Sequence, residues 1–177
     1  WIKTKGKEIL KVNNTDVWEF GTEGLAKFLD AKGKYGFINP DGKKVVPAKN
    51  DYADDFVNGL VRVGQKGVYD ENGAYSGGKW GFYNVKGKAA VRISYDYADA
   101  FSGDLARVST KGVWADGKYS GGKWGFVNTR GKEIIKLKYE EFEDDGKIIR
   151  TAKRDLEMMA DMYLSSKNYQ AALDALS

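Results

Sequence analysis

The chain has 177 residues, with 22 glycines, 2 prolines and 14% aromatic residues, and it contains neither cysteine nor histidine. These absences exclude disulfides, cysteine zinc sites, thiol nucleophiles and imidazole catalysis, and no cofactor is expected. The formal net charge of +4 is ordinary for a protein surface and predicts no nucleic-acid binding. No apolar run approaches the roughly 20 residues that span a bilayer, which predicts no membrane insertion by this segment.

A tripeptide of an aromatic residue, glycine and phenylalanine recurs through the chain, each time after a lysine. The copies are Tyr35-Gly36-Phe37, Trp80-Gly81-Phe82 and Trp124-Gly125-Phe126. Each leads to an asparagine and then to a Gly-Lys pair, and Trp1-Ile2 leads to Gly6-Lys7 at the same offset. Such a period is the signature of a repeat protein. The three phenylalanines are therefore predicted to occupy equivalent, mostly buried strand positions, and the chain is expected to begin inside a repeat of a longer protein.

Each repeat is expected to form antiparallel hairpins. Asn39-Pro40-Asp41-Gly42 has the composition of a type I turn between two short β runs. A second hairpin is predicted to join each repeat to the next aromatic-Gly-Phe strand, and its turn is short at Asp30-Ala31-Lys32-Gly33. The glycine between the two aromatic residues is expected to allow the close approach of a backbone or a ring.

The second hairpin is longer in the next two repeats. Residues 67–78 and 112–122 each have the pattern of a strand, a turn and a strand, which predicts two protruding arms. The pairs Gly77-Gly78 and Gly121-Gly122 are predicted to form β-bulges that bend the arms. Aromatic residues flank the two tips: Tyr69 with Tyr75, and Trp114 with Tyr119.

The last part of the chain changes character. From about Thr151, apolar residues at helical spacing predict one amphipathic helix, and a second short one follows a polar break at 165–168. The sequence therefore predicts two parts, a β-repeat array over 1–150 and a truncated helical hairpin over 151–177.

The ordered strings resemble the bacterial WG repeat, also called the KWG repeat, over Trp1 to about Lys147. Asn50 departs from the pattern, because the equivalent residues are Tyr95 and Tyr139. The segment from Met159 to Ala172 resembles the start of a tetratricopeptide (TPR) repeat. The resemblance implies a mainly β, antiparallel, solenoid-like array of hairpins, with a closed propeller as the alternative. It also implies a bacterial binding scaffold, often of the cell envelope, rather than an enzyme.

Three groups of residues are candidates for a functional site. The aromatic-Gly-Phe residues are expected to form the core, because each repeat buries its face on a neighbour. Asp51, Asp54, Asp55, Asp96, Asp99 and the turn Asp70–Gly73 could supply oxygens for calcium, but turn formation explains them equally well. The four tip aromatics, Tyr69, Tyr75, Trp114 and Tyr119, are either a binding surface or cross-strand contacts within their own hairpins.

The leading hypothesis is therefore a non-enzymatic repeat scaffold that binds another protein. The alternative is a carbohydrate or cell-wall glycan-binding module that uses the four tip aromatics. Neither a metal nor a catalytic residue is expected.

Overall fold

A computed structural model describes residues 2–4, 7–10, 16–140 and 158. They fall into two compact units, one within Trp1–Tyr69 and Gly78–Ser94, the other within Asp70–Gly77 and Tyr95–Ser177. No helix element occurs among the described residues, and no helix there is long and apolar enough to cross a membrane. Apart from Met158, the helical hairpin predicted for 151–177 lies outside the described residues.

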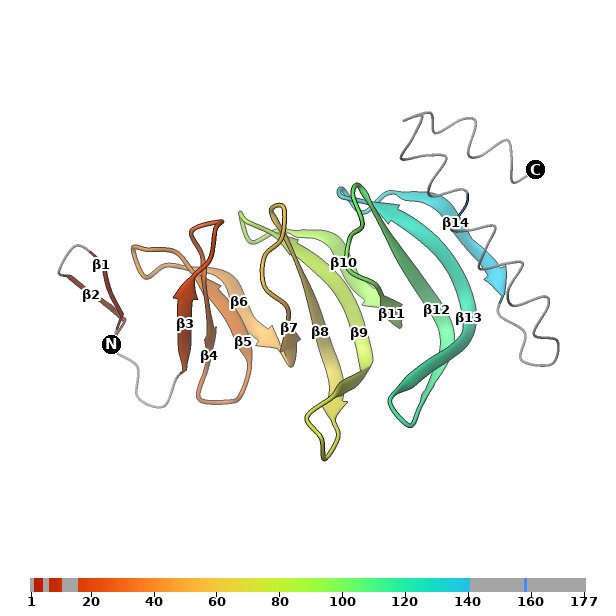
Figure 1. Ribbon diagram of the computed structural model, residues 1–177, viewed down its shortest axis with the longest axis horizontal. Helices are drawn as coiled ribbons and strands as arrows, with labels where there is room; N and C mark the ends of the chain where they lie inside the picture. Colours follow the sequence, from red (N-terminus) through yellow and green to blue (C-terminus); the bar gives the residue numbers. More distant parts are fainter. Residues whose placement is uncertain (1, 5–6, 11–15, 141–157, 159–177) are drawn as a thin grey trace. The chain divides into compact units, whose positions relative to one another are not determined.

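The described strands form open antiparallel sheets in which consecutive strands are neighbours (Figure 1). A small sheet pairs β1 (Ile2–Thr4) with β2 (Lys7–Leu10). The first four-stranded sheet contains β3 (Val17–Phe20), β4 (Ala26–Leu29), β5 (Tyr35–Ile38) and β6 (Lys44–Asn50). The second contains β7 (Tyr52–Ala53), β8 (Leu60–Tyr69), β9 (Tyr75–Asn84) and β10 (Ala89–Tyr95). The third contains β11 (Tyr97–Ala98), β12 (Leu105–Ala115), β13 (Lys118–Asn128) and β14 (Glu133–Glu140). The mainly β, antiparallel prediction is confirmed, and none of these sheets closes into a barrel.

The predicted repeat register is confirmed. Phe37, Phe82 and Phe126 lie in the equivalent strands β5, β9 and β13, and all three are buried. Trp80 and Trp124 are buried beside them. In the first unit, Phe37 packs edge-on against Phe56 with ring centroids 4.8 Å apart. Residues of the first and second sheets thereby share one core.

The turns are built by the side chains that precede them. The Oδ1 atom of Asn39 accepts hydrogen bonds from the backbone N–H groups of Asp41 and Lys43, at 3.1 and 2.9 Å. Asn84 and Asn128 accept the same two bonds in their own turns. A polar residue that caps its own turn explains why Asn recurs at this offset.

Candidate functional site

A single aspartate separates each four-stranded sheet from the next one along the chain. Asp51 separates β6 from β7, and Asp96 separates β10 from β11. Their backbone N–H groups donate to the carbonyls of Gly64 and Ser109, each at 2.9 Å. Their carboxylates accept bonds from the backbone N–H groups of Lys66 and Lys111, at 2.6 and 2.7 Å. Asp51 also pairs with the ammonium group of Lys34. Each aspartate therefore joins the start of one sheet to the base of an arm.

The arms bend where these aspartates bind them. Lys66 and Lys111 both have a φ of 63°, in the left-handed region that lysine rarely adopts. In the second arm the strand pairing keeps one register across the bend, with Thr110 opposite Lys123 and Gly112 opposite Gly121. The bulge predicted at Gly121-Gly122 is therefore wrong, since a bulge inserts an unmatched residue into one strand. The strands instead bend together, with left-handed residues in both.

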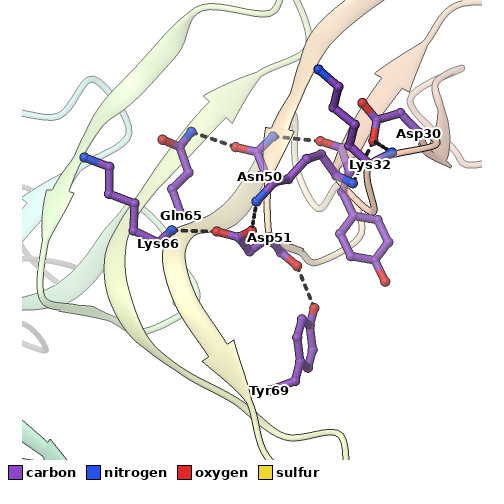
Figure 2. A network of polar contacts seen from close by, with 9 residues as sticks. Asp30, Lys32, Asn50, Asp51, Gln65, Lys66 and Tyr69 are labelled. Carbon is purple, nitrogen blue, oxygen red and sulfur yellow. Dashed lines mark hydrogen bonds and ion pairs between the residues drawn. The ribbon is translucent and has the colours of Figure 1, made fainter.

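Each arm is also fastened by an aromatic residue at or near the end of its first strand. The Tyr69 hydroxyl donates to the backbone carbonyl of Asp51 at 2.7 Å, and the Trp114 Nε1–H donates to that of Asp96 at 2.9 Å. Both bonds span 18 residues, so Tyr69 and Trp114 are structurally equivalent. Figure 2 shows Tyr69 below Asp51, with Lys66 on the carboxylate side. The arms thus leave their sheets at defined positions.

Beside Asp51, the buried Asn50 is fully satisfied. Its Nδ2 group donates to the carbonyls of Tyr35 and Pro47, and its Oδ1 accepts from Gln65 at 2.9 Å (Figure 2). Asn50 has no exposed surface. The departure from Tyr at this position is therefore accommodated by a closed polar network.

Four aromatic rings form a cluster at the base of the second arm. Tyr97 lies 5.2 Å from Tyr119, 5.4 Å from Trp124 and 5.9 Å from Trp114, between ring centroids. The Tyr119 hydroxyl accepts a bond from the Gly112 N–H at 2.9 Å and lies 3.0 Å from the Ser109 hydroxyl. The Trp124 Nε1–H donates to Gly121. The polar edges of these rings are therefore used within the unit.

An arginine and an aspartate complete this arrangement in both units. Arg107 lies 4.8 Å from the Trp124 ring centroid, and its Nε donates to Asp99 at 2.7 Å, while Tyr97 donates to the same carboxylate. In the first unit, Arg62, Asp54, Tyr52 and Trp80 have the same relations. Burial lowers the pKa of Arg62. The Asp54 carboxylate and the Tyr52 hydroxyl raise this pKa by more than burial lowers it, so the result lies above the ordinary value. Sequence reasoning missed this group, although the constant offset of eight residues from aspartate to arginine signals it.

The acidic candidates have structural partners. The Asp70 carboxylate accepts the N–H groups of Asn72 and Ala74, each at 2.9 Å, as a turn cap. Asp54 and Asp99 bind tyrosine and arginine. Within residues 16–140, no three acidic side chains form a group that could hold a metal ion.

The four tip aromatics differ in exposure. Tyr69 is 48% exposed, whereas Tyr75, Trp114 and Tyr119 are half-buried. The most exposed large apolar side chains of the arms are instead Val68 and Val113, at 65% and 64%. They occupy equivalent positions, one residue before Tyr69 and Trp114. A cavity of about 260 Å³ lies elsewhere, along β3, where Val17, Trp18, Glu19 and Phe20 line it.

Comparison with known proteins identifies the repeats. A family model described as "WG containing repeat" matches residues 35–69, 80–114 and 124–147, more than half of the chain. No curated protein matches the chain. A solved structure described as "Crystal structure of the eukaryotic initiation factor" is similar over 64% of this chain and 28% of its own, with 10% identity and a TM-score of 0.36. The matched stretches begin at the aromatic-Gly-Phe strings that organise the sheets, and the chain belongs to the WG-containing repeat family.

Proposed function

We propose that this chain is a non-enzymatic, solenoid-like repeat scaffold that binds another protein through its two arms. The arms comprise residues 67–78 and 112–122. Their inner attachments are made by Tyr69, Trp114 and the two junction aspartates. This anchoring holds the arms in place before a partner arrives, which reduces the entropy that binding must overcome.

The observation that carries the proposal is the repeated exposure of Val68 and Val113. A β-branched residue that is nearly two thirds exposed near the end of a strand contributes little to its own fold. A single exposed apolar residue is ordinary, but here the same position is exposed in two consecutive repeats. Tyr69 follows Val68 in the first arm, so this arm also exposes part of a ring, on the opposite face of the strand. Tyr75, Trp114 and Tyr119 are assigned to the same binding arms.

The experiment compares arm variants with a matched control. The double variant Val68→Asp/Val113→Asp and the control Val57→Asp/Val85→Asp introduce the same charges at exposed valines, and the control lies off the arms. Proteins of the source cells are cross-linked to each immobilised chain and identified by mass spectrometry. A partner that is captured by the native chain and the control, but lost with the arm variant, supports the proposal. Equal capture by all three forms contradicts it.

A glycan-binding module is the second candidate, and the exposed ring of Tyr69 is the observation that favours it. A flat aromatic face with a polar edge suits the apolar side of a sugar ring. Co-sedimentation with purified cell-wall glycan tests this reading. Binding that falls with Tyr69→Ala and persists in Val68→Asp would select the glycan over the protein partner.

A further inference from the structure

The turns that follow the aromatic-Gly-Phe strands each carry two exposed cations. Lys43 and Lys44 follow the turn between β5 and β6, Lys86 and Lys88 lie in the turn between β9 and β10, and Arg130 and Lys132 lie in the turn between β13 and β14. The turns themselves do not need these side chains. Their hydrogen bonds use the asparagine oxygen and backbone N–H groups, which any non-proline residue supplies.

Packing in the first unit brings two of these turns together. Gly87 lies directly against the carbonyl of Val45 in β6, so closely that a Cβ on Gly87 would overlap that oxygen. Lys86 and Lys88 flank Gly87, and Lys44 precedes Val45. Figure 1 shows the β9–β10 turn beside β6 within this unit. Lys43, Lys44, Lys86 and Lys88 are called the lysine patch below.

The positive charges of the lysine patch are not paired with nearby carboxylates of the described chain. Among residues 16–140, no carboxylate lies within ion-pairing distance of the four ammonium groups. Lys44 lies 5.5 Å from the Phe28 ring centroid, the one cation–π contact of the patch. Asp41, in the first turn, is the acidic residue nearest in sequence. Like charges on adjoining turns repel one another, and no ion pair with residues 16–140 offsets this repulsion.

We propose that the lysine patch binds an acidic segment of a partner protein. The inference rests on the proposed protein-binding function and adds the chemistry of one contact. Ammonium groups are point charges without the planar fork that favours phosphate. Recognition of single-stranded nucleic acid also needs exposed rings for stacking, whereas the large exposed apolar residue of these turns is Val85. The carboxylates of an acidic peptide complement these four ammonium groups in charge.

The test uses the full chain and a fluorescein-labelled ten-residue glutamate peptide, with binding followed by anisotropy. The patch variant changes Lys43, Lys44, Lys86 and Lys88 to Gln. The control variant changes Lys32, Lys49, Lys118 and Lys136 to Gln, which removes the same charge from exposed positions elsewhere. We expect the patch variant to bind about tenfold more weakly, and the control to stay within about threefold of the native chain. Affinity should also fall as salt is raised.

Three results would overturn the inference. Equal losses in both variants would show that net charge, not the patch, attracts the peptide. Tighter patch-dependent binding of a labelled oligothymidylate, or of vesicles rich in anionic lipid, would assign the patch to another class of anion. If the peptide fails to bind while capture still depends on Val68 and Val113, only this inference falls. If arm-dependent capture fails, the proposed function falls instead.

Discussion

The glycine between the two aromatic residues is required by the neighbouring strand. A Cβ on Gly81 would lie 2.6 Å from the Val91 carbonyl oxygen and 2.7 Å from the Ile93 Cα, both in β10. A Cβ on Gly36 would meet Val46 and the Phe28 ring at 2.7–2.8 Å, and one on Gly125 would overlap the backbone of Ile135. The close approach that the sequence predicts is therefore confirmed in all three repeats.

Replacing Gly81 by Ala should lower the free energy of unfolding by about 2 kcal/mol, because β10 must move away from β9. Gly21→Ala is the matched control, since its Cβ would lie an ordinary 3.8 Å from the Leu25 carbonyl. Urea unfolding followed by tryptophan fluorescence measures both changes. Equal effects of the two substitutions would contradict the steric explanation.

Two tyrosines, the half-buried Tyr52 and the buried Tyr83, make stability depend on alkaline pH. Burial raises the pKa of Tyr52 above its ordinary 10.0, and the hydrogen bond to Asp54 raises it further. Burial also raises the pKa of Tyr83, against a smaller opposite effect of Gln65. The unfolded chain therefore ionises these groups first, so their contribution is full below pH 10 and is lost as the pH rises above it.

The double variant Tyr52→Phe/Tyr83→Phe should accordingly show a shallower fall in the free energy of unfolding between about pH 9.5 and 11 than the native chain. Urea melts at several pH values give the two slopes. The slopes, not the absolute stabilities, are compared, because Tyr52→Phe also removes a bond to Asp54. Parallel slopes would contradict the assignment.

At the scale of the elements, each arm contains side chains that pack within the fold and side chains that remain exposed. Trp114 is fixed by its bond to Asp96 and by contacts with Tyr97 and Tyr119. Val113, the preceding residue in the same strand, is largely exposed. Alternation along a strand sends successive side chains to opposite faces. Stability and binding should therefore respond to different residues of one arm.

Trp114→Ala should lower the free energy of unfolding by about 2 kcal/mol, less than for a fully buried tryptophan. Val113→Ala should change it by less than about 0.5 kcal/mol. Thermal and urea melts compare the two variants. A larger loss for Val113→Ala would show that the arm packs on its other face.

At the scale of the molecule, contacts between sheets depend on a few close approaches. In the first unit, Gly87 of the β9–β10 turn lies against Val45, and the Glu23 carboxylate accepts the Gly59 N–H at 3.0 Å. Lys27 forms an ion pair with Asp55 at 2.9 Å. Repeat proteins gain stability from such neighbour interfaces.

Comparing Gly87→Ala with Gly33→Ala distinguishes the contribution of this interface to stability from the cost of backbone strain. Both glycines have a positive φ, of 76° and 72°, but a Cβ on Gly33 meets nothing within 4 Å. Gly33→Ala should cost about 1 kcal/mol through strain alone. Gly87→Ala should cost about 2 kcal/mol more, because it also displaces β6. Hydrogen exchange at β6 should rise in Gly87→Ala only, and unchanged protection there would contradict the interface.

Much of this architecture follows from the sequence because it is local and repeated. The register of Phe37, Phe82 and Phe126, the capped turns and the two arms all depend on residues close together in the chain. The left-handed Lys66 and Lys111 could not be predicted, since lysine carries no preference for that conformation. The bonds from Tyr69 and Trp114 to the junction aspartates span 18 residues and depend on the bend of the arm. Neither the secondary-structure propensity of single residues nor the periodicity of apolar residues predicts such contacts.

The order of the strands has a consequence for how the chain acquires its structure. Within every four-stranded sheet, each strand after the first pairs with the one synthesised just before it. Contacts of short sequence separation need little loop closure, and they favour rapid folding for a β protein. The second sheet is complete once Tyr95 has been made, before any strand of the third exists. Successive sheets can therefore form in turn as the nascent chain leaves the ribosome, which shortens the time that unpaired strand edges are open to aggregation.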